Sequence, residues 1–206
     1  DDPWEILRTY GANVKSALPI GTVLTLPATG SESNGNSVIS RKATQEKLFF
    51  SADCVFPLFS VLDPVTTFSL PEKQVRNGIV DAFVHVMEQY MTYPVAAHLQ
   101  DRFAEGILQT LVEIGPVTLR KPKHYDARAS LMWSATLALN NLISCGVPQD
   151  WTTHMIGHEV TAFYGLDHAE TLAIILPGVW MNQFNRKQAK LKQFGRRVFG
   201  VTTAKN

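Results

Sequence analysis

The chain has 206 residues, a formal net charge of +1 at pH 7 and 45% hydrophobic residues. These values are typical of a globular protein that buries a sizeable core, and the near-neutral charge argues against a nucleic-acid partner. No apolar run is long enough to span a bilayer, so we expect no membrane partner. Cys54 and Cys145 are distant and form no C-x-x-C pattern, which predicts reduced thiols and a cytoplasmic location.

The first 65 residues alternate short apolar runs with turn-forming segments. They predict a short helix and a turn within 4–16, a buried strand over 18–26, a hairpin over 37–40 and 47–50, and a second buried strand over 56–62. Residues 28–36 are rich in small and hydroxyl side chains, which can bring hydroxyl and N–H groups to a phosphate. An ordinary polar loop has the same composition, so both interpretations stay open.

After Pro71 the apolar residues recur with helical spacing. The pattern predicts helices near 72–92, 95–114, 124–143, 150–163, 169–182 and 186–199. We therefore divide the chain into a β-rich part, residues 1–65, and an all-helical part, residues 66–206.

Five polar residues in the helical part have the spacing of a metal site. Asp81 and His85 lie four residues apart, as do His154 and His158, so each pair shares one helix face. His168 follows a turn and can point back toward them. One carboxylate with several imidazoles suits Fe²⁺, Zn²⁺ or Co²⁺. The alternative is a set of buried histidines that hydrogen-bond within the core. A zinc-protease motif is absent, because no H-E-x-x-H occurs.

Together these residues resemble the metal motif of the iron-containing alcohol dehydrogenase family, with the last histidine inside residues 165–169. Residues 25–32, of sequence TLPATGSE, resemble that family's threonine-rich cofactor segment. Residues 77–85 and 147–151 are close to its butanol-dehydrogenase-like branch. The resemblance covers essentially the whole chain.

The resemblance implies an α/β plus all-α fold of the dehydroquinate synthase type. Residues 1–65 would be the C-terminal part of an α/β dinucleotide-binding domain, and residues 66–206 a helical metal-binding domain. It implies that one divalent ion, Fe²⁺ or Zn²⁺, is held by Asp81, His85, His154 and His168. It also implies that NADP(H) is lined by Thr25, Thr29, Ser31, Asn34, Asn36 and Lys47.

The activity implied is hydride transfer between NADP(H) and a small aldehyde or primary alcohol, by a cytoplasmic homodimer. The ion would act as a Lewis acid, and His158 would be the catalytic residue that relays a proton. Phe83 and Trp151 either shape an apolar substrate pocket or pack in the core. The alternatives are a polyol (glycerol-type) dehydrogenase or another enzyme on the same fold, and an inactive metal-binding fragment.

The chain begins at Asp1 without Met and ends just after a helical pattern. We therefore expect it to be a piece of a longer protein. The family's Gly-Gly-Gly-Ser pyrophosphate loop has no counterpart here, so we expect weak NADPH binding by this chain alone.

Overall fold

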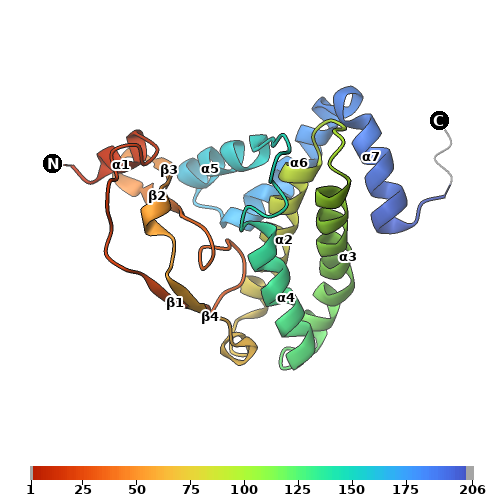
Figure 1. Ribbon diagram of the computed structural model, residues 1–206, viewed down its shortest axis with the longest axis horizontal. Helices are drawn as coiled ribbons and strands as arrows, with labels where there is room; N and C mark the ends of the chain where they lie inside the picture. Colours follow the sequence, from red (N-terminus) through yellow and green to blue (C-terminus); the bar gives the residue numbers. More distant parts are fainter. Residues whose placement is uncertain (1, 203–206) are drawn as a thin grey trace.

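The structure is a computed structural model that describes residues 2–202, and its elements form two groups (Figure 1). The first group contains α1 (Trp4–Arg8), β1 (Gly21–Val23), β2 (Asn36–Arg41), β3 (Glu46–Ser51) and β4 (Phe59–Val61). The second contains α2 (Glu72–Tyr90), α3 (His98–Arg120), α4 (Tyr125–Ala138), α5 (Thr152–Tyr164), α6 (His168–Asn182) and α7 (Phe184–Phe199). The assignment of these groups to two domains that meet near residue 65 stays a prediction.

Helix α2 is the central element of the helical group. It packs against α3, α4 and α6, and its second half is buried on every side. Ala82, Val86 and Met87 join apolar residues of α3 and α4 in the main core, which Phe194 of α7 completes. Polar side chains on so deeply buried a helix need partners, because an unpaired polar group inside a protein is costly. Asp81, one such residue, is therefore where the chemistry is expected.

The predicted hairpin is present as the antiparallel pair β2–β3. Its register runs from Asn36 opposite Ser51 to Arg41 opposite Glu46. Strand β3 also lies against α5, which Figure 1 shows between the hairpin and the other helices. This contact brings Lys47 of β3 toward the helical group.

The two predicted buried strands are the main correction. Only three residues of each form a strand, and β1 and β4 pair in parallel with each other. Leu18, Leu58 and Phe59 are 85%, 76% and 65% exposed. The apolar runs predicted burial on both faces, but a two-stranded pair has no further layer to bury them against.

Helix bounds differ from the prediction where tertiary packing outweighs local sequence. Helix α3 begins at His98 and continues through Pro116 to Arg120, because its packing on α2 and α4 compensates for the backbone bond that proline removes. Helix α4 ends at Ala138, earlier than predicted. Helix α1 ends at Arg8 and is followed by turns, in agreement with the predicted short helix and turn. Within residues 2–202, no helix has both the length and the apolar character needed to cross a bilayer.

Candidate metal centre

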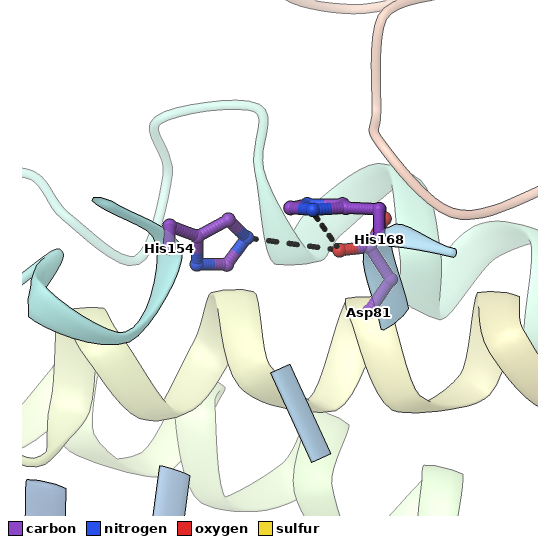
Figure 2. Close-up of side chains that lie close together, drawn as sticks. All are labelled: Asp81, His154 and His168. Atoms are coloured by element: carbon purple, nitrogen blue, oxygen red, sulfur yellow. Dashed lines mark ion pairs between the residues drawn. The ribbon is translucent and has the colours of Figure 1, made fainter. Parts of the chain in front are cut away.

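Three helices bring the predicted metal ligands together. Asp81 and His85 lie one turn apart on α2, and both are buried. His154 and His158 lie one turn apart on α5, also buried, and His168 is the first residue of α6. The close-up in Figure 2 shows His154 and His168 approaching the Asp81 carboxylate from α5 and α6.

Three imidazole nitrogens converge on one carboxylate oxygen. The Nε2 atoms of His85, His154 and His168 lie 3.5, 3.7 and 3.6 Å from Asp81 Oδ1. The ligand atoms of Asp81, His154 and His168 all lie within 4.8 Å of one another. His85 approaches the same oxygen from one side, with its ring stacked on that of His154 at 4.7 Å between centroids. His158 lies next to this group rather than within it, with its ring centroid 5.3 Å from that of His168.

The unpaired atoms at this point fit a divalent cation. Asp81 Oδ1 and His154 Nε2 are buried and have no hydrogen-bond partner among the described residues. The ion pairs of Asp81 within residues 2–202 are all with histidines, and none is with lysine or arginine. A buried carboxylate is costly unless it is paired or coordinates a metal. Imidazole nitrogens with one carboxylate oxygen are a donor set suited to Fe²⁺, Zn²⁺ or Co²⁺.

The electrostatics of the cluster centre on Asp81. Burial alone would raise the pKa of this carboxyl, but His85, His154 and His168 outweigh burial and hold the pKa well below its usual range. Burial likewise opposes the charge of His154, yet the neighbouring Asp81 and Glu88 raise the pKa of this histidine to about 9. The carboxylate is therefore ionised and ready to bind a cation at neutral pH.

The other three histidines at the cluster, His85, His158 and His168, stay neutral at neutral pH. Burial lowers the pKa of His85 to about 4 and that of His168 to about 4. Burial, with a contribution from the nearby Lys47 charge, lowers the pKa of His158 to about 3. A neutral imidazole keeps one unprotonated nitrogen, and this is the form that binds a metal or accepts a proton.

A close helix–helix approach holds His154 and His168 within reach of each other. Gly157 of α5 faces α6, and a Cβ at this position would lie 2.9 Å from Thr171 Oγ1. A larger side chain at this position would force the side chain of Thr171 to turn aside or the two helices to move apart. Gly157 was not among the predicted site residues, because a glycine within a helical pattern gives no indication of what it faces.

The start of α6 is fixed to α2 by polar contacts. Lys73 pairs with Asp167 at 2.9 Å and with Glu170 at 3.1 Å, and the Asn77 amide donates to Asp167 Oδ2 at 3.3 Å. The backbone N–H of Asp167 donates to Glu170 Oε2, which is the return half of a capping box. These contacts set the direction in which His168 enters the cluster.

The predicted cofactor residues differ in how exposed their side chains are. The side chains of Thr25, Thr29 and Ser31 are exposed along the loop that precedes β2, and that of Asn36 is exposed at the first position of β2. Asn34 is buried, and its amide donates to Thr29 O at 3.1 Å and to Leu139 O at 3.0 Å. This amide anchors the loop to the end of α4, and the role of Asn34 toward the cofactor stays a prediction.

Lys47 connects the hairpin with the metal cluster. Its Nζ atom lies 3.3 Å from Nδ1 of His168. Burial lowers the pKa of the Lys47 ammonium, partly offset by the charge of Asp81. The structure thus places the one charged candidate of the cofactor segment beside the proposed ligands.

The two aromatic candidates differ in position. Phe83 packs against the main core, with its ring 6.3 Å from that of Phe194. Trp151, just before α5, has its ring 5.2 Å from that of His154 and 6.1 Å from that of His85. Trp151 therefore borders the cluster, whereas the half-buried Phe83 packs on the edge of the main core, away from the cluster.

Sequence reasoning missed one polar residue at the centre, Glu88. It lies on α2 two turns after Asp81, on the same face, and its carboxylate contacts the His154 ring. The spacing of seven residues was the available signal.

Two family models match the chain. Residues 1–64 match the iron-containing alcohol dehydrogenase model, and residues 76–206 match the C-terminal model of the same family. The NADPH-dependent aldehyde reductase YqhD of Escherichia coli is 61% identical over 98% of this chain and 52% of its own length. The NADH-dependent butanol dehydrogenase B of Clostridium acetobutylicum is 39% identical over 100% of this chain and 53% of its own.

Solved structures show the same architecture. The crystal structure of E. coli YqhD matches with a TM-score of 0.98 and 60% identity, over 99% of this chain and 52% of that one. The NADH-dependent butanol dehydrogenase A of Thermotoga maritima matches with a TM-score of 0.94 and 35% identity, over 98% of this chain and 51% of that one. The predicted fold class is confirmed. The chain spans about half the length of the relatives it matches.

Proposed function

Because the chain belongs to the iron-containing alcohol dehydrogenase family, we propose that the protein transfers a hydride reversibly between NADP(H) and a small aldehyde or primary alcohol. The observation that carries the proposal is the convergence of three imidazole Nε2 atoms on the buried, otherwise unpaired Oδ1 of Asp81. Buried oxygen and nitrogen atoms without a hydrogen-bond partner are expected where they coordinate a metal ion, and elsewhere their burial costs free energy.

We assign Asp81, His85, His154 and His168 as the residues that hold one divalent ion, Fe²⁺ or Zn²⁺. When bound, such an ion acts as a Lewis acid toward a carbonyl oxygen. The protein supplies a dry surrounding, because the side chains of Asp81, His85 and His154 are almost fully buried. Trp151 borders the space beside these ligands and offers an apolar face to the carbon chain of a substrate.

His158 is assigned as the proton relay. It lies beside the proposed ligands but is not among them, which supports a role toward the substrate oxygen. Because its pKa is lowered to about 3, the ring is neutral at neutral pH. A neutral imidazole relays a proton by accepting at one nitrogen and releasing from the other, without storing a charge.

The cofactor is assigned to the loop before β2 and to the hairpin. The exposed hydroxyls of Thr25, Thr29 and Ser31 are available to a dinucleotide, with Asn36 beside them. Lys47 offers a positive charge beside the metal cluster. We assign NADP(H) because the 61% identical reductase of E. coli is NADPH-dependent. The butanol dehydrogenase B of C. acetobutylicum, at 39% identity, is NADH-dependent.

The cytoplasmic location and the homodimer complete the proposal. Cys54 and Cys145 are both free thiols, which supports a reducing compartment. The homodimer rests on the family resemblance alone, and sedimentation of the purified protein tests it.

The test combines metal analysis with a substrate panel. In the full-length protein we expect one Fe²⁺ or Zn²⁺ per chain, and oxidation of NADPH that depends on short-chain aldehydes. Glycerol and other polyols, offered with NADP⁺ and with NAD⁺, identify the polyol dehydrogenase alternative. Metal binding without turnover on any substrate would contradict the proposed activity and favour a metal-binding role only.

A further inference from the structure

Glu88 is a buried acid that the proposed chemistry does not use. It lies on α2, two turns after Asp81, and is 4% exposed. Within residues 2–202 its only ion-pair partner is His154, and no lysine or arginine neutralises it. A carboxylate so placed is costly unless its oxygens are hydrogen-bonded, so its contacts indicate its role.

Both oxygens of Glu88 contact the first turn of α5. Oε1 accepts the backbone N–H groups of Thr153, at 2.6 Å, and of His154, at 3.3 Å. Trp151, the residue at the N-cap position of α5, makes no side-chain capping bond. Glu88 therefore caps α5 from another helix, and its negative charge suits the positive end of the helix dipole.

The second oxygen fixes the His154 ring. Oε2 of Glu88 contacts Nδ1 of His154. An ionised carboxylate only accepts hydrogen bonds, so Nδ1 carries the proton that it donates to Glu88. The opposite nitrogen, Nε2, points to Asp81 Oδ1 at 3.7 Å and has no hydrogen-bond partner of its own.

His154 is the only one of the converging histidines with such support among the described residues. No carboxylate of the described chain lies behind His85, whose hydrogen-bond contact on that ring is with the backbone of Ala28, and His168 Nδ1 faces the Lys47 ammonium, which donates hydrogen bonds and accepts none. A carboxylate behind a metal-bound histidine sets the ring direction and makes the imidazole a stronger ligand.

We propose that Glu88 is a positioning residue for the metal centre. Its carboxylate holds the His154 ring with Nδ1 protonated and Nε2 directed at the ion. Because one carboxylate both caps α5 and orients the ring, the backbone of α5 and the ligand atom are set by the same contact. The inference rests on the proposed metal site, and it concerns affinity for the ion rather than the reaction.

The test measures binding of Co²⁺ alone to the full chain, by titration and by the visible absorption of the bound ion. Glu88→Gln keeps the size of the side chain and one carbonyl oxygen for the cap, but it removes the charge behind the ring. We expect its Kd for Co²⁺ to rise about 10- to 100-fold, with a changed absorption spectrum.

Glu105→Gln is the matched control. Glu105 is also a buried acid, and it accepts from Tyr90, Gln193 and Arg197 away from the cluster. We expect this variant to lose stability in the same way but to keep the Kd and the spectrum of the unaltered chain.

Glu88→Asp is a second variant, which keeps the test decisive if Glu88→Gln does not fold. The shorter side chain keeps the charge but draws it back from the ring, so the rise in Kd should be smaller than for Glu88→Gln. If both folded variants bind Co²⁺ with the affinity and spectrum of the unaltered chain, Glu88 does not position His154, and the proposed function stands. If the unaltered chain binds no Co²⁺, the metal site itself is wrong and this inference falls with it.

Discussion

The helical region, residues 66–202, and the front region, residues 2–65, differ in how far their side chains are buried. In the helical region, α2 is surrounded by other helices, and both its apolar residues and its acids are buried. In the front region, the short strands β1 and β4 leave Leu58 and Phe59 exposed, and the candidate cofactor hydroxyls face solvent. The metal cluster is therefore built within one packed unit. The cofactor segment instead alternates exposed hydroxyl residues with buried ones, such as Pro27, which closely approaches Gly78 of α2, and Asn34, which bonds to the end of α4.

This difference indicates which function depends on which region. Every proposed metal ligand lies on α2, α5 or α6, so the ion site should withstand changes in the front region. The loop is attached through Asn34 to α4 and through Lys47 to His168. The predictions below test this separation, from the largest expected effect to the smallest.

Asp81→Ala should abolish metal binding. Among the described residues, the change removes the one carboxylate oxygen on which the three Nε2 atoms converge, so the imidazoles would face the ion without the negative charge of Asp81. Metal content of the purified variant measures the effect. Asp53→Ala, an exposed acid of the front region, should keep its metal, and equal metal content in both variants would place the site elsewhere.

His158→Gln should slow turnover roughly 10²- to 10⁴-fold, the usual contribution of a general acid or base. Its metal content should not change, since His158 lies beside the cluster rather than in it. His154→Gln should lose the metal. Metal analysis and steady-state rates of the two variants decide the matter, and the opposite pattern would show that the two roles are exchanged.

Acid should destabilise the metal-free helical region. His85, His158 and His168 have pKa values of about 4, 3 and 4 in the folded chain, against about 6.5 when unfolded. The unfolded chain therefore binds more protons as pH falls from about 6.5 to 4, and each histidine removes stability at up to about 1.4 kcal/mol per pH unit.

The pKa shift of His154 has the opposite effect on stability. Its raised pKa of about 9 stabilises the fold below pH 6.5, and this contribution is lost as pH rises through 9. The urea midpoint in the presence of a chelator should therefore be highest near pH 6.5. The front region has no histidine in residues 1–65, so protection of its hairpin amides should not follow this curve except through global unfolding. A midpoint that is constant from pH 6.5 to 4 would contradict the burial of these rings.

Gly157→Ala should lower the free energy of unfolding by about 2 kcal/mol, because the new methyl group overpacks the α5–α6 contact at Thr171. Affinity for Co²⁺ should fall as well, since His154 and His168 move apart. Gly106→Ala is the control: no atom lies within 4 Å of a Cβ there, so helix propensity should stabilise α3 slightly. Chemical unfolding of both variants distinguishes packing from propensity.

Asn34→Ala should cost about 1 kcal/mol for each hydrogen bond lost, because the carbonyls of Thr29 and Leu139 lose their donor and the N–H of Asn36 loses its acceptor. Affinity for Co²⁺ should stay unchanged, which would confirm that the ion site is independent of the loop. Ser31→Ala, at an exposed position of the same loop, should change neither stability nor metal binding. A loss of metal on Asn34→Ala would show that the two regions are coupled.

The sequence by itself determined the local features of this protein. Helical periodicity located the helices of the second region, and spacings of four residues placed Asp81 with His85 and His154 with His158 on common faces. These features follow from geometry within one element, which neighbouring residues encode. The motif also carried the family resemblance, and with it the proposed ligand set.

The tertiary structure decided the contacts between elements and the burial of each strand. The convergence of α2, α5 and α6 on Asp81 Oδ1 depends on a close approach at Gly157, and the contact of Glu88 with His154 joins residues 66 positions apart. The exposure of β1 and β4 depends on which layers cover a strand, and an apolar run does not contain that information. Periodicity gives the face on which a side chain lies, whereas packing alone determines what that face meets.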